Sequence, residues 1–235
     1  FDVPFAEQVC ADAWKLMEQI PVDWVGSGKL LFDAESVESQ LTKLKKKPID
    51  LLLIMQLTFT DATMTVKIAE SFDVPLLFWS FPEKRTGGRL RLNSLCGVNL
   101  AAHALGKSGI QCDYINLSPN DPETSEDLSS WIRAFQTRKN LSSTKIAVIG
   151  KHPDGFHTCA FDSGKLKEIS GVTVEQMELT DLFDEAEKIE QKTVNLIRSE
   201  LDSKINGLEL VEQEPLEKSI RILSTLRKKA ESEGY

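Results

Sequence analysis

Two apolar runs of strand length constrain the fold of this chain more than any other feature. They cover residues 49–55 and 75–79, and neither shows the alternation of apolar and polar residues that is typical of a half-exposed strand. Such runs suit a parallel sheet, whose faces are both covered by helices. Residues 62–72 between them fit a crossover helix, so the sequence predicts a parallel βαβ unit.

The remaining segments continue the alternation of helices and strands. We expect helices over 5–20, 35–47, 93–107, 127–138, 182–201 and 216–232, and strands over 112–117, 145–150 and 172–179. The predicted fold class is α/β, with two Rossmann-like parallel-sheet units of which the second is incomplete. We place an amino-terminal Rossmann-like domain at 1–141, with its first strand missing, and the start of a central α/β domain at 142–235. The first helix lacks an opening strand and the last ends at Gly234, so we expect both ends to be cut.

Charge and hydropathy exclude two classes of partner. The 235 residues hold 28 Lys and Arg against 36 Asp and Glu, a formal charge of -8, which repels nucleic acid and anionic membranes. No apolar run approaches the roughly 20 residues of a membrane span and the amino end has no signal-peptide pattern, so we expect a cytoplasmic protein. The four cysteines form no CxxC pair, which favours reduced and mostly buried thiols.

The loop after the first apolar run holds an aromatic residue among hydroxyl side chains. Ligands of open parallel sheets lie at the carboxyl ends of the strands, so residues 56–64 lie where a site is expected. Thr60 or Asp61, as the N-cap of the next helix, accounts for about half of the polar residues there. Capping does not explain Phe59, whose ring suits the apolar face of a sugar.

The loop after the second run, residues 80–94, concentrates cations around two glycines. It contains a carboxylate, a glycine pair and four cations: Glu83, Gly87, Gly88, Lys84, Arg85, Arg89 and Arg91. In one interpretation this is a solvated loop in which Glu83 pairs with one of the cations. In the other, the glycines allow close approach of a neighbour or ligand, and an arginine such as Arg89 offers its planar fork to an anion. The glycines do not form a GxGxxG pattern, so we exclude a nicotinamide cofactor.

A third loop, residues 150–159, holds two of the three histidines and a cysteine. His152, His157 and Cys159 are all residue types that bind zinc. No helix or strand period puts them on one face, and Pro153-Asp154-Gly155 is by itself a turn signal. We therefore interpret this segment as a turn and assign no metal ligand to it.

With these loops the chain resembles the L-fucose and L-arabinose isomerase superfamily, and within it the fucose-isomerase-like branch. The segments that carry the resemblance lie between residue 1 and about residue 162: 1–7, 56–64, 79–83, 93–97, 102–105 and 152–156. The resemblance implies three domains, a role in carbohydrate metabolism, and a divalent metal, usually manganese, held by acidic residues and histidine. It places those metal ligands in parts of the parent protein that these 235 residues do not include.

The resemblance also implies that the amino-terminal domain completes the active site of a neighbouring subunit, so we expect a homo-oligomer. The family's aromatic contact falls on Phe59, its histidine contact on His103, and a third contact near Asp2. A histidine among small helical residues also fits a hydrogen-bonded core position, so two interpretations of His103 stay open.

We therefore predict the front part of a metal-dependent aldose-ketose isomerase acting on a small sugar. In such enzymes a metal polarises the carbonyl and a carboxylate moves a proton between neighbouring carbons. No catalytic residue is assigned here, and this piece alone is expected to be inactive. The candidate substrate contacts are Phe59, His103, Asp2 and Arg89. Two alternatives stay open: a non-catalytic sugar-binding α/β module, and a related enzyme that acts on an anionic sugar.

Overall fold

The two apolar runs form neighbouring strands of one parallel sheet, as the sequence predicts. They are β1 (Leu52–Gln56) and β2 (Leu76–Ser80), and β3 (Asp113–Asn116) pairs with the other side of β2. The connections contain α3 (Thr63–Ala69) and α4 (Ser94–Lys107), which confirms the βαβ prediction. The carboxyl ends of all three strands therefore lie along one edge of the sheet.

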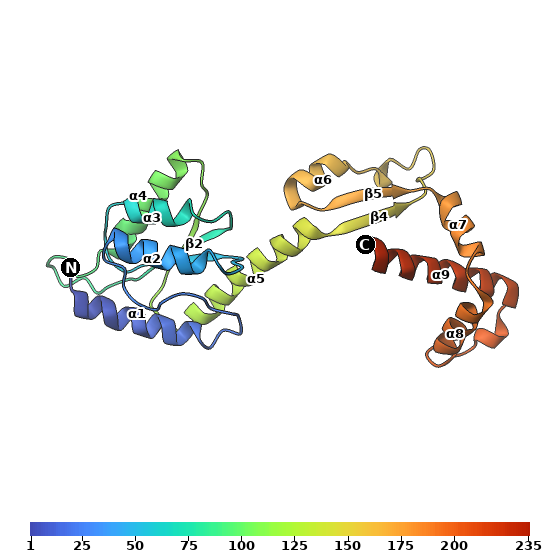
Figure 1. The fold of residues 1–235 in the computed structure, drawn as a ribbon, viewed down its shortest axis with the longest axis horizontal. Coiled ribbons are helices and arrows are strands. Elements are labelled where there is room, and N and C mark those ends of the chain that lie inside the picture. The colour runs from blue at the N-terminus through green and yellow to red at the C-terminus, as the bar shows by residue number, and fades with distance from the viewer. The chain divides into compact units, whose positions relative to one another are not determined.

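The central strand β2 is covered on both faces and is buried along its whole length. Leu77 and Trp79 pack against α1 (Val3–Met17) and the first half of α5 (Thr124–Ser143). Phe78 packs on the opposite face, against α3 and α4. Figure 1 shows α1 on the other side of the strands from these two helices. The strand is thus a rigid support for the loop that follows it.

The computed structural model describes residues 1–235, which divide into two units, 1–136 and 137–235. In the second unit, β4 (Lys145–Ile149) and β5 (Thr173–Met177) form a parallel pair, so the fold is α/β with two small parallel sheets. The remaining helices are α2 (Ala34–Leu44), α6 (Ser163–Ser170), α7 (Leu179–Glu187), α8 (Gln191–Asp202) and α9 (Gln213–Glu233). No helix combines the length and the apolarity that a membrane crossing requires.

The single helix predicted over 182–201 is wrong, because the structure has two helices there. Helix α7 ends at Glu187, and Glu190 adopts an extended conformation just before α8 begins. The guanidinium of Arg221 donates to the main-chain carbonyl of Ile189, which satisfies an acceptor at the break. Val194 of α8 packs against Ile220 of α9, so tertiary packing sets the direction of α8 and overrides the continuous helical pattern.

The prediction of mostly buried cysteines is also wrong, because two of the four are exposed. All four are free thiols; Cys10 is buried, Cys112 is half-buried, and Cys96 and Cys159 are exposed. Burial raises the pKa of the Cys10 thiol. Cys159 lies in a short 3-10 turn without any buried residue, so no apolar neighbours cover it.

Candidate functional site

The carboxyl edge of the first sheet is organised around residues 91–94, which lead into α4 and which we call the α4 junction. Ser94 is almost completely buried. Its hydroxyl donates to the main-chain carbonyl of Gln56 and accepts from the main-chain N–H of Phe81 at 2.9 Å. One side chain therefore fastens the start of α4 to the segments at the ends of β1 and β2.

The carboxylate of Glu83 binds the main-chain N–H groups of the α4 junction. It accepts hydrogen bonds from the main-chain N–H groups of Arg91 at 2.7 Å, Leu92 at 3.1 and 3.2 Å, and Asn93 at 2.7 Å. Asn93 has a left-handed conformation with φ 54°, which asparagine tolerates better than most residues. Successive N–H groups that converge in this way form an anion-binding concavity, and here the chain fills it with its own carboxylate.

Asp2 joins the amino-terminal segment to the same junction. Its Oδ1 accepts from the main-chain N–H of Phe5 at 3.1 Å and so caps α1, while its Oδ2 accepts from Nε of Arg91 at 2.8 Å. The Arg91 guanidinium also lies 3.7 Å above the centre of the Phe5 ring. The hydrogen bond from Arg91, followed by that from Phe5, lowers the pKa of the Asp2 carboxyl. Arg91 is therefore paired within the chain, with Asp2 and with the Phe5 ring.

Phe59 reaches the junction through its main chain. Its N–H donates to the carbonyl of Leu92 at 2.9 Å, and its side chain is 36% exposed. The buried side chain of Gln56 shapes this loop from inside, because its amide donates to the Thr58 carbonyl at 2.8 Å and to the Thr60 hydroxyl at 3.2 Å. The loop is thus held in place while the aromatic ring stays accessible.

The prediction that Thr60 or Asp61 is the N-cap of α3 is wrong. Asp61 accepts from the main-chain N–H of Thr63 at 2.8 Å, and hydrogen bonds from the side chain and then the main chain of Thr63 lower the pKa of its carboxyl. The N-cap position itself is Ala62, which has no capping side chain, and the Thr60 hydroxyl donates to the Asp61 carbonyl instead. Both polar side chains therefore serve the loop, and neither caps α3 from the N-cap position.

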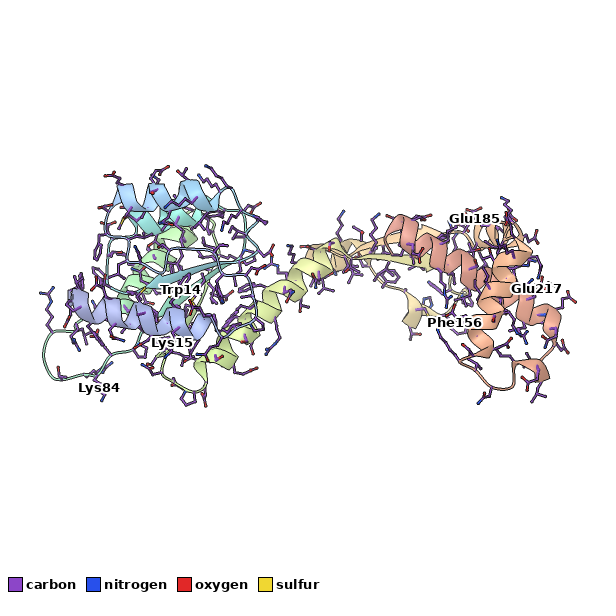
Figure 2. All side chains as sticks on the ribbon, turned by 60° about the horizontal axis from the view of Figure 1, so that its bottom comes forward. Trp14, Lys15, Lys84, Phe156, Glu185 and Glu217 are labelled. Carbon is purple, nitrogen blue, oxygen red and sulfur yellow. The ribbon has the colours of Figure 1, made fainter.

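The cations of residues 84–90, which we call the basic loop, differ from Arg91. Lys84, Arg85 and Arg89 are exposed and form no hydrogen bond or ion pair within the chain. Figure 2 shows Lys84 on this loop, directed away from the helices of its unit. Gly87 has φ +81°, and nothing lies within 4 Å of the position that a Cβ would take on Gly87 or on Gly88.

The structure brings two of the four predicted contacts together, because Asp2 and Phe59 both bind the α4 junction. Arg89 is exposed two residues before the junction and forms no hydrogen bond or ion pair with it, and His103 does not reach it. His103 is exposed on α4, nine residues after Ser94, which is about 14 Å along the helix axis. The core interpretation of His103 is therefore wrong, because the outward face of α4 has nothing packed over this residue.

The residues of this chain do not fit a metal ion. No group of three His, Cys, Asp or Glu side chains is arranged to hold one, and this includes His152, His157 and Cys159 of the third loop. A hollow of about 400 Å³ in the second unit is rich in carboxylates, but Lys229 lies among them, 2.9 Å from Glu185 and 3.3 Å from Glu233. That ammonium occupies the place where a cation would be most attracted.

Sequence reasoning missed the residues that build the junction, namely Glu83, Ser94 and Gly97. It predicts an ion pair for Glu83 in a structural loop, but the carboxylate binds main-chain N–H groups, which no charge pattern reveals. A Cβ on Gly97 would lie 3.1 Å from the Thr58 carbonyl oxygen, so this glycine lets α4 pack against the Phe59 loop. The available signal was the glycine within an otherwise regular helical pattern.

Residues 5–142, more than half of the chain, match the family model "Fucose/sulfoquinovose isomerase, N-terminal domain". Sulfoquinovose isomerase of Priestia megaterium (strain ATCC 12872 / QMB1551) is 30% identical over 192 residues, which are 82% of this chain and 43% of that protein. The enzyme of the same name from Alkalicoccus urumqiensis is 30% identical over 164 residues, 70% of this chain and 37% of that protein. The chain thus spans about two fifths of the length of these relatives. It belongs to the family of fucose/sulfoquinovose isomerase N-terminal domains.

Proposed function

We propose that the chain is the front part of a sugar isomerase that interconverts the aldose and ketose forms of an anionic sugar. The family match and the sulfoquinovose isomerase relatives support the reaction class. One observation carries the choice of substrate: Lys84, Arg85 and Arg89 stand at the ligand-binding edge without a partner in the chain. A sulfonate or phosphate on the sugar would supply that partner, because arginine binds such groups through two parallel hydrogen bonds.

Within this proposal the chain supplies walls of the sugar site and no group that transfers a proton. Phe59 offers its ring to the apolar face of the sugar, Arg89 binds the anionic group, and Asp2 lies at the same junction. Phe59 and His103 together complete the sugar site of a neighbouring subunit, His103 from the exposed face of α4. We assign these roles to an amino-terminal domain that ends near residue 141.

The proposal extends to the whole enzyme in three respects. Manganese is the proposed metal, and its ligands belong to other parts of the parent protein, since this chain offers no group of three ligands. We propose a homo-oligomer because Phe59, Leu95 and Leu100 leave apolar surface exposed beside α4, which a neighbouring subunit would cover. We also propose that the enzyme works in the cytoplasm on a soluble sugar.

Binding of an anionic and a neutral sugar tests the proposal. The parent enzyme is titrated calorimetrically with sulfoquinovose and with its neutral 6-deoxy counterpart, at low and at high salt, before and after Arg89→Ala. A charge-assisted hydrogen bond to an anion contributes about 1.5–3 kcal/mol, roughly ten- to a hundredfold in affinity. We expect Arg89→Ala to weaken binding of the sulfonated sugar by that factor at low salt and to leave the neutral sugar unaffected.

Lys107→Ala is the matched control, because it removes one exposed cation from the far end of α4. It should change the affinity for neither sugar by more than the general effect of net charge. If both sugars respond equally to Arg89→Ala at every salt concentration, the anion site does not exist, and a neutral deoxy-sugar or pentose becomes the better substrate.

A further inference from the structure

We propose that Glu83 is a positioning residue that sets the anion specificity of the basic loop, an inference that rests on the proposed function. Its carboxylate binds the three N–H groups of residues 91–93 and so joins the two ends of the segment between Glu83 and Arg91. These hydrogen bonds fix the positions of both ends of the basic loop. We call the segment from Glu83 to Arg91, closed in this way, the arch, and its two ends the base of the arch. Lys84, Arg85 and Arg89 are the arch's three cations without a partner in the chain.

The geometry explains why side chains rather than main-chain groups are left to bind the ligand. Converging N–H groups are the usual main-chain site for an anion in folds of this class. Here Glu83 already occupies them, with two of its contacts at 2.7 Å. An anionic ligand therefore has the cations of the arch as its partners, and these are the groups that distinguish a charged sugar from a neutral one.

Arg91 has a different role from the other three cations. Its guanidinium is paired with Asp2 at 2.8 Å and lies over the Phe5 ring, so an anionic ligand would compete with Asp2 for it. Its main-chain carbonyl accepts from the N–H of Asp2 at 3.2 Å. Arg91 thus connects the base of the arch to Asp2 and α1, while the hydrogen bonds of Glu83 hold the two ends of the arch together.

The direction in which one substitution changes the affinity for an anion distinguishes a positioning role of Glu83 from a simple effect of its charge. Glu83→Gln removes a negative charge close to the cations, which by electrostatics alone would strengthen the binding of an anion. Glutamine also places an NH2 group against N–H donors, so it breaks part of the closure. If Glu83 positions the arch, affinity for the anion falls although the site has become more positive.

The experiment titrates sulfoquinovose and its neutral 6-deoxy counterpart into the unmodified parent enzyme and into its Glu83→Gln, Glu83→Asp and Glu70→Gln variants. Glu70 is the matched control, an exposed carboxylate at the C-cap of α3. We expect Glu83→Gln to weaken the sulfonated sugar about three- to tenfold and to leave the neutral sugar unchanged. Glu83→Asp keeps the charge but shortens the side chain, so it should weaken the sulfonated sugar as well. Glu70→Gln should leave the preference intact.

Amide hydrogen exchange at residues 91–93 is measured in parallel and should rise in both Glu83 variants. If the unmodified parent enzyme prefers the sulfonated sugar and Glu83→Gln binds it equally or more tightly, the positioning role is refuted while the proposed function stands. If the unmodified parent enzyme shows no preference between the two sugars, the anionic substrate is refuted, and the inference with it. If Glu83→Gln does not fold, Glu83→Asp provides the test. An unchanged preference of that variant for the sulfonated sugar contradicts the positioning role of Glu83.

Discussion

A methyl group added at Gly97 is expected to destabilise the first unit, against the usual effect of this substitution. Alanine in place of a helical glycine ordinarily stabilises by about 0.5–1 kcal/mol. At Gly97, however, the new Cβ would lie 3.0 Å from Cγ of Gln56 and 3.1 Å from the Thr58 carbonyl oxygen. Neither neighbour can move freely, because the Gln56 amide donates to that same carbonyl and to Thr60. Crowding of this kind costs about 1–3 kcal/mol.

Gly106→Ala on the same helix provides the comparison, because nothing lies within 4 Å of a Cβ at Gly106. The helix-propensity gain occurs in both variants, so the free energies of unfolding should differ by the crowding cost alone, about 1–3 kcal/mol. All four tryptophans lie in residues 1–136, so urea unfolding followed by tryptophan fluorescence reports on this unit. Equal stability of Gly97→Ala and Gly106→Ala would refute the reasoning that Gly97 permits close packing against the Phe59 loop.

Four further outcomes are expected. Ser94→Ala removes two buried hydrogen bonds of the α4 junction and should lower the free energy of unfolding by about 1–3 kcal/mol in the same urea assay. Arg91 lowers the pKa of Asp2, so this pairing stabilises the fold above the ordinary carboxyl pKa near 4 and is lost as the pH falls through the folded value. NMR titration of the Asp2 carboxyl should show a midpoint below that of an ordinary aspartate, and Arg91→Ala should raise it again. Phe59→Ala in the parent enzyme should raise KM without changing its metal content, measured by elemental analysis. The 235-residue chain alone should show no aldose-ketose turnover with added manganese, and measurable turnover would contradict the assignment of the metal ligands to other parts.

The strands and crossover helices were predictable because their signals are local. Two apolar runs and the helix pattern between them suffice for a parallel unit, and β1, α3 and β2 lie where that pattern puts them. The break between α7 and α8 was not predictable in the same way. It depends on Arg221 and on packing against α9, which lie some thirty residues further along the chain.

The candidate site was predictable in its position but not in its construction. Strand ends and loop composition point to Phe59 and to the basic loop, since unusual residue types at a sheet edge are visible in the sequence. The hydrogen bonds of Glu83 and Ser94 run to main-chain groups eight or more residues away. Every residue has those groups, so residue types carry no information about which of them will be bound.

The contrast between Phe59 and the exposed cations of the basic loop predicts which part of sugar recognition depends on salt. Phe59 is placed by a main-chain hydrogen bond at the α4 junction, and an aromatic contact with a neutral ring is not screened by ions. The cations of the basic loop are exposed, so their attraction for an anion falls as the Debye length shrinks from about 10 Å at 0.1 M salt to about 3 Å at 1 M. The preference for a charged sugar should therefore decline with salt while affinity for the neutral sugar stays constant. A preference that survives 1 M salt would mean that the anion is held by buried groups that this chain does not provide.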